Sequence, residues 1–257
     1  MKAKDLFLQY FKEDLAGHGF RRKGKFFFRM NGEILQGIGV DAVPFQYYVR
    51  YSQFPFWCYR LLYKDLPLSK GYWVADGDSP KMSFFLNAKP EENIREMEFN
   101  HKAYQTEIFP LLDATVDEKT YIEAKSKKRF ALDRWSMIPP HVILYACHLD
   151  GSWEYAQNWI ACKRDERQRN APIRAQQQWE THLKFLKKPP EGYVPTECTY
   201  EELLAKEMNA FDCTLQLRFG LLLDKMEQND LNWIKDIHDS ESEYMRELLK
   251  TELNIIV

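Results

Sequence analysis

The sequence predicts an α+β protein in which an N-terminal helix and a four- to five-stranded antiparallel sheet precede a mostly α-helical C-terminal half. Aromatic residues make up 15% of the chain and many lie in its first 110 residues. This favours strands there, because aromatic side chains suit a pleated, half-buried surface. An Asn-Gly pair between two apolar runs indicates a β-hairpin. After Pro90 the strand-like segments end and helical periodicity takes over.

The first predicted element is a helix over residues 4–16, because its apolar side chains fall on one stripe and Gly17 and Gly19 follow it. Beyond the hairpin, aromatic and alternating segments predict further strands at residues 45–53, 71–75 and 82–86. We therefore expect a sheet that packs on the first helix.

Residues 25–30 and 33–40 are predicted to form the hairpin. A two-residue type I′ turn at Asn31-Gly32 fits, because this turn requires a positive φ at both central positions. The turn sets a register with the pairs Phe28–Leu35, Arg29–Ile34 and Phe27–Gln36.

Six helices are predicted in the remainder of the chain, at residues 90–113, 117–131, 139–168, 172–187, 199–227 and 230–253. Pro90 suits a first helical position, because the N–H that it lacks would have no helical partner there. Capping boxes are indicated at Thr199-x-x-Glu202 and at Ser240-x-x-Glu243, where hydroxyl and carboxylate accept from N–H groups at the start of a helix.

The expected division is an α+β sheet domain over residues 1–115 and a helical region over residues 116–257, with a possible linker at 187–196. The charge changes sign at that linker. Residues 119–190 carry 14 basic and 7 acidic residues, whereas residues 191–257 carry 6 basic and 15 acidic residues. This asymmetry indicates either a basic region docking on an acidic one within the fold, which we favour, or a surface directed at a charged partner.

The five cysteines are odd in number and widely spaced, with no C-x-x-C pair, which indicates reduced thiols. Acidic residues within the first apolar stretch favour an amphipathic helix over a secretory signal. The most apolar segment, residues 135–149, is too short to cross a membrane. We therefore expect a cytoplasmic protein that does not contact a membrane.

Motifs for phosphate loops, dinucleotides, serine nucleophiles and zinc proteases are absent, so we predict no cofactor, no metal and no catalytic residue. Glu98-x-x-His101 has the spacing of a di-iron ligand pair, but such a bundle needs a second copy, which the sequence lacks. Cys147 and His148 are neighbours and therefore point to different faces of a helix.

Cations and aromatic rings follow one another at residues 21–29, a combination that single-strand nucleic-acid binders use. We favour the alternative of a basic connection whose phenylalanines belong to the core. Two further basic runs, at residues 125–129 and 163–169, would suit phosphate backbones. Acidic residues in the second run make it more typical of a salt-bridged helix face, so nucleic-acid binding is an alternative that we do not favour.

The stretch Gly19–Arg29, followed by Ile34–Gly37, resembles the bacterial domain-of-unknown-function family 4304. That family tends to show a helix, a GF-basic-basic-x-G-x-x-F-x-R stretch and then a strand with a glutamine, which is Gln36 here. The pattern departs at residues 37–39, where Gly-Ile-Gly replaces the usual polar and basic residues. The resemblance covers residues 4–115 and implies an α+β fold and a bacterial origin, but no reaction.

We expect a non-catalytic bacterial interaction protein that binds another macromolecule, most readily a protein, with an immunity or regulatory role as one form of this function. The reasons are the missing catalytic motifs, the aromatic-rich sheet and the acidic end of the chain, which would suit a basic partner such as a nuclease. The immunity role follows only by analogy with similar small bacterial proteins. The candidate partner-binding residues are Arg21, Arg22, Lys23, Arg29 and Gln36.

Two other functions stay open. An enzyme with its site at the junction of sheet and helices would draw on Asp76, Asp78, Glu98, His101, His141 and His148. A nucleic-acid-binding protein would use the basic residues of the region 119–190.

Overall fold

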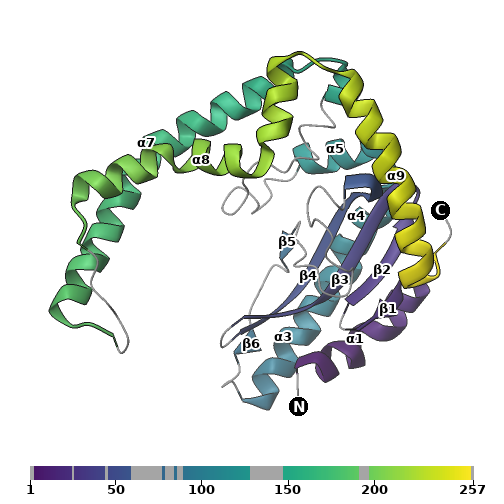
Figure 1. Ribbon diagram of the computed structural model, residues 1–257. Coiled ribbons are helices and arrows are strands. Elements are labelled where there is room, and N and C mark those ends of the chain that lie inside the picture. The colour runs from purple at the N-terminus through teal and green to yellow at the C-terminus, as the bar shows by residue number, and fades with distance from the viewer. Residues whose placement is uncertain are drawn as a thin grey trace. The chain divides into compact units, whose positions relative to one another are not determined.

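The computed structural model describes residues 3–24, 26–43, 46–58, 77–78, 84–85, 89–127, 147–190 and 197–255 (Figure 1). The chain forms two compact units, of which the first comprises residues 1–136 and 236–257 and the second residues 137–235. These bounds differ from the expected division at residue 115, because the last helix of the chain packs on the N-terminal sheet.

The first unit contains the predicted antiparallel sheet. Its strands are β1 (Arg21–Lys23), β2 (Phe26–Asn31), β3 (Ile34–Val43), β4 (Gln46–Pro55), β5 (Gly77–Asp78) and β6 (Phe84–Phe85). They are ordered β1-β2-β3-β4-β5, and β6 also pairs with β4. The strand predicted at residues 71–75 lies outside the described residues, whereas the one predicted at 82–86 is found as β6.

The β2–β3 hairpin is confirmed, but the predicted position of its turn is wrong. Asn31 pairs with Ile34, so the central turn residues are Gly32 and Glu33. Gly32 has a φ of +59°, which is typical of the first central position of a type II′ turn. Asn31 stays in the strand because its side-chain amide donates to the carbonyl oxygens of residues 112, 113 and 115.

The register is consequently shifted by two residues from the predicted one. The observed pairs include Phe27–Ile38, Phe28–Gly37, Arg29–Gln36 and Met30–Leu35, in place of Phe28–Leu35, Arg29–Ile34 and Phe27–Gln36. Because side chains alternate between the faces of a strand with a period of two, a shift of two residues keeps Phe28 and Leu35 on one face and Phe27 on the other, whereas Ile34, beside the turn, packs in the cluster of Phe28 and Leu35.

Helices cover both faces of the sheet, which buries its apolar residues on either side. One face packs on α1 (Ala3–Gly17), α3 (Pro90–Ala103) and α4 (Phe109–Ala114), and a π-helical turn at Tyr104–Ile108 joins α3 to α4. The other face packs on α5 (Glu118–Lys127) and α9 (Asn232–Leu253) (Figure 1). α9 contributes the buried side chains of Met245, Leu249 and Leu253.

The second unit is built around α7 (Glu154–Lys187) and α8 (Tyr200–Glu227), a helical hairpin whose helices lie side by side (Figure 1). The prediction of two helices broken near residue 170 is wrong, because α7 continues through Pro172. Buried Ala171 and Ala175 allow α8 to approach closely there. The preceding helical turn ends at Gly151, whose φ of +63° suits a helix terminus, and residues 139–146 lie outside the described structure.

Two predicted capping boxes have different outcomes. The box at Thr199 is confirmed, because the backbone N–H of Glu202 donates to Thr199 Oγ1 and the Glu202 carboxylate accepts from the N–H of Thr199. The box at Ser240 is wrong, since Ser240 lies inside α9. The Asp230 carboxylate instead accepts from the N–H of Trp233 at the start of that helix.

Replacing Gly32 with alanine should destabilise the first unit by about 2 kcal/mol or more. A Cβ at this position would lie 2.1 Å from the carbonyl oxygen of Val116, in a backbone conformation that L residues rarely adopt. The control is Gly17→Ala, because a Cβ there would meet no atom within 4 Å. Urea denaturation measures both free energies of unfolding, and equal values for the two variants would contradict the turn geometry.

Candidate functional site

Two of the predicted partner-binding residues contact the end of α9. Arg21 donates through Nη1 to the carbonyl oxygen of Asn254, and Lys23 donates through Nζ to the carbonyl oxygen of Glu252 at 2.9 Å. Cations are favourable at the C-terminus of a helix, where carbonyl groups lack helical partners. Arg22 lies between them, is exposed, and donates to the carbonyl oxygen of Gly24. The basic strand β1 therefore holds α9 against the edge of the sheet.

Arg29 and Gln36 form a buried polar pair between β2 and β3, with only 9% and 0% of their surface exposed. The Arg29 Nε donates to the Gln36 Oε1 at 2.7 Å. The guanidinium also donates to the carbonyl oxygen of His18, at the end of α1, and to the Asp113 carboxylate at 2.6 Å. Gln36 in turn donates to the carbonyl oxygen of Leu112 at 2.6 Å. These bonds connect α1, the hairpin and α4.

The contacts that the structure shows for Arg29 and Gln36 are thus internal to the chain. The guanidinium of Arg29 also lies 4.6 Å from the centre of the Phe20 ring, a cation–π distance. Among the five predicted partner-binding residues, Arg22 is the one whose side chain contacts neither α4 nor α9 in the described structure. A partner-binding role for this set stays a prediction.

The residues considered for an enzyme are not gathered at one described site. Glu98 accepts from the hydroxyl of Tyr10 at 2.9 Å, which raises the pKa of Tyr10, and His101 contacts the Asp14 carboxylate at 2.8 Å. Both contacts join α3 to α1. His148 is exposed in the second unit. Asp76 and His141 lie outside the described residues, as does the side chain of Asp78.

A buried cluster that the sequence did not indicate surrounds Cys58. Trp57 donates through Nε1 to Glu118 at 3.0 Å, and His238 of α9 lies 3.7 Å from the same carboxylate. Burial, followed by the charges of Glu118 and Glu241, raises the pKa of the Cys58 thiol well above its usual value. A protonated thiol is a poor nucleophile, so this cluster favours a structural role. No group of three or more metal-binding side chains occurs within the described ranges.

The other cysteines separate into one buried and three more accessible thiols. Burial and the charge of Asp150 raise the pKa of Cys147 to about 12, while its neighbour His148 is exposed, as the sequence predicts for adjacent helical residues. Cys162 and Cys213 are exposed on α7 and α8, and Cys198 is partly buried. Cys147 and His148 therefore do not form a nucleophile–base pair.

The basic run on α7 is salt-bridged, as its acidic residues predict. Lys163 pairs with Glu166 at 3.0 Å, and Arg164 pairs with Asp212 of α8 at 2.8 Å. Arg169 donates to the carbonyl oxygen of Asp165. Part of the other basic run, residues 128 and 129, lies outside the described structure.

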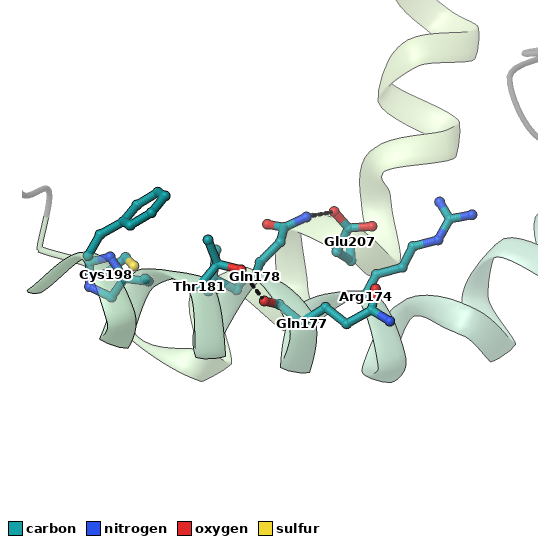
Figure 2. Close-up of a pocket in the computed structure, with 9 residues that line it drawn as sticks. Arg174, Gln177, Gln178, Thr181, Cys198 and Glu207 are labelled. Atoms are coloured by element: carbon teal, nitrogen blue, oxygen red, sulfur yellow. Dashed lines mark hydrogen bonds between the residues drawn. The ribbon is translucent and has the colours of Figure 1, made fainter. Parts of the chain in front are cut away.

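A pocket of about 560 Å³ lies along the α7–α8 hairpin (Figure 2). α7 lines it with Arg174, Gln177, Gln178, Thr181, His182 and Phe185, whose spacing places them on one face of the helix. Cys198, Leu203 and Glu207 line the other side. Figure 2 shows the Gln178 amide reaching the Glu207 carboxylate, to which it donates at 2.5 Å. This pocket was not predicted from the sequence, although the spacing of its residues on α7 was a visible signal.

The same hairpin exposes large apolar side chains. On α7 these are Tyr155, Ile173, Leu183, Phe185 and Leu186, and on α8 they are Met208, Leu217 and Leu221. Leu217 and Leu221 are 86% and 61% exposed and lie on either side of a break in α8, where the backbone leaves helical geometry at Phe219. Exposed apolar residues of this kind are candidates for an interaction surface.

Comparison of the chain with protein-family models, with curated proteins and with solved structures finds no match. Among the helices that the structure describes, none combines the length and the apolar character needed to cross a membrane.

Replacing Gln36 with leucine should destabilise the first unit by about 2–4 kcal/mol, because Arg29 then loses an acceptor while it stays buried and the Leu112 carbonyl loses a donor. Gln9→Leu is the matched control, since Gln9 is exposed on α1 and its replacement should change stability by less than about 0.5 kcal/mol. Urea denaturation provides both values. A Gln36→Leu variant as stable as the control would show that the buried pair does not hold the three elements together.

Native-state alkylation should modify Cys162 and Cys213 and leave Cys58 and Cys147 unmodified. The exposed thiols are accessible, whereas burial keeps the other two protonated. Because the pKa of Cys147 is about 12, only about one thiol in a thousand is ionised even at about pH 9, so its labelling should stay negligible at that pH. Mass spectrometry after brief exposure to iodoacetamide identifies the labelled peptides, with urea-unfolded protein as the control for full reactivity. Rapid labelling of Cys147 in the folded protein would contradict its burial.

Proposed function

We propose that the chain is a non-catalytic protein that binds another protein through its α7–α8 hairpin. The observation that carries this proposal is the exposure of Leu217 and Leu221, together with Ile173 of α7, whose side chain is 59% exposed. Burying such side chains against a partner is favourable by roughly 1.5–3 kcal/mol for each leucine that becomes fully buried. The hairpin therefore offers the apolar contacts that the centre of a protein interface requires.

The contacts of the cations on the same hairpin support a protein partner over a nucleic acid. Arg164 is paired with Asp212, and Lys163 with Glu166, so these charges are already balanced within the hairpin. Binding to a phosphate backbone depends on cations that can replace counterions along an extended track. An immunity or regulatory role is one form of this proposal, since covering a partner's surface requires no catalytic group. The proposal also includes a cytoplasmic location, which the free state of all five cysteines supports.

The acidic end of the chain contributes less to this proposal than the hairpin does. Its acidic residues are divided between α8 in the second unit and α9, most of which belongs to the first. Several already have basic partners, such as Asp212 with Arg164 and Asp230 with Lys225. The resemblance of residues 19–37 to family 4304 implies no activity, so the proposal rests on the hairpin itself.

The double variant Leu217→Asp/Leu221→Asp should lose its partner. Both side chains are exposed, so the variant should fold as the native chain does, while two charges at an apolar contact should weaken binding by about tenfold or more. The measurement is quantitative capture from a native lysate, followed by the affinity of the captured protein for purified chain. Circular dichroism verifies the fold.

The charge-matched control is Gln157→Glu/Gln216→Glu, which adds the same charge at exposed polar positions of α7 and α8. This control should retain the partner. Equal capture by the native chain and both variants would exclude the apolar surface of the hairpin as the binding site, and the lack of a specific partner for the native chain would refute the proposed function.

A further inference from the structure

The pocket of the hairpin has one polar end and one apolar end, both on α7. Arg174 and Gln177 lie at the polar end, and Phe185 lies eleven residues after Arg174. Because an α-helix rises 1.5 Å per residue, the two ends are about 16 Å apart along the helix. A ligand that contacts both ends is therefore extended.

The polar end is suited to a carboxylate. Within the described part of the chain, Arg174 has neither a hydrogen bond nor an ion pair. The one carboxylate of the pocket lining belongs to Glu207, which already accepts from Gln178. Figure 2 shows the guanidinium of Arg174 extending away from that pair. A planar guanidinium binds a carboxylate through two parallel hydrogen bonds, and the neighbouring Gln177 amide offers a further donor.

The other end is suited to an apolar side chain. Phe185 is exposed at the end of α7, and Leu203, near the start of α8, also lines the pocket. An extended peptide advances about 3.3 Å per residue, so a span of about 16 Å corresponds to about five residues. A nucleic acid would present repeated phosphates, whereas Arg174 is the one arginine or lysine that lines this pocket.

We infer that this pocket binds an extended segment of the partner protein, with an acidic side chain on Arg174 and a large apolar side chain about five residues away, against Phe185. The inference rests on the proposed function, because the segment belongs to the partner. In this inference the pocket recognises the sequence of the partner's segment. Leu217 and Leu221 provide apolar contact area elsewhere on the hairpin.

The probe is the peptide Glu-Ser-Gly-Ser-Gly-Leu, acetylated at its N-terminus and amidated at its C-terminus so that the glutamate side chain carries its one carboxylate. Isothermal titration calorimetry with the full chain should show saturable binding at millimolar peptide or below. Replacing the peptide's glutamate with glutamine, or Arg174 with glutamine, should each weaken binding by about tenfold or more. Combining the two changes should cause no further loss, because both remove the same contact.

Arg169→Gln is the matched control, since Arg169 lies on the same helix but outside the pocket and donates to a backbone carbonyl. This control should bind the peptide as the native chain does. Phe185→Ala should weaken binding of the peptide that ends in leucine but not of one that ends in glycine.

Two results would overturn the inference: no saturable binding of the peptide at millimolar concentration, or equal binding by the native chain and Arg174→Gln. Either result can occur while partner capture still depends on Leu217 and Leu221, in which case the proposed function stands without this pocket. If partner capture does not depend on Leu217 and Leu221, the proposed function is refuted, whatever the outcome of the peptide titration.

Discussion

The buried hydrogen bond between Arg29 and Gln36 is the interaction on which the sheet unit depends. A guanidinium taken out of water is costly unless its donors are satisfied, and here the acceptors come from three places in the chain: His18 after α1, Gln36 in β3 and Asp113 at the end of α4. The hairpin alone brings Gln36 to Arg29, whereas the other two acceptors are in position only when α1 and α4 have packed on the sheet. The contact therefore links helix, hairpin and the α3–α4 segment beside a cluster of buried apolar residues.

The basic stretch beside this pair also has a structural explanation. Arg21 and Lys23 bind the last carbonyl groups of α9, so a basic segment near the start of the chain meets the end of an acidic one. The charge asymmetry concerns residues 119–190 and 191–257, and between these regions the ion pair of Arg164 with Asp212 is a contact within the fold. The contacts of Arg21 and Lys23 are made to helix carbonyl groups, which no count of acidic side chains would reveal.

Local signals predicted much of the fold. The Asn-Gly pair marked the hairpin, Pro90 marked the start of α3, and Thr199 with Glu202 marked the start of α8. Each of these three signals depends only on residues that are close together in the sequence. The register failed because Asn31 bonds to carbonyl groups about 80 residues away, and those bonds keep it in the strand. The sequence predicted two helices in place of α7, with a break before Pro172, because proline removes one helical hydrogen bond. The sequence does not show that packing on α8 outweighs this loss.

The site was less predictable than the fold for a similar reason. A row of basic residues is visible in any sequence, but whether a cation is available depends on what lies across from it. Arg29 and Arg174 are both flanked by apolar residues in the sequence, yet one is enclosed by acceptors and the other has no described partner. The pocket forms only where α7 and α8 lie side by side, because it is lined by residues 174–185 and by residues 198–207. The sequence alone does not show that these two segments meet.

The return of α9 to the first unit has a consequence for how the chain is made. A ribosome releases β2, β3 and β4 long before it releases residues 236–255, because the whole second unit is translated in between. During that interval the sheet face that carries Phe28, Leu35 and Phe54 has no α9 to cover it. An uncovered apolar sheet face is prone to aggregate, so the first unit passes through an aggregation-prone stage that lasts until the end of the chain has been made.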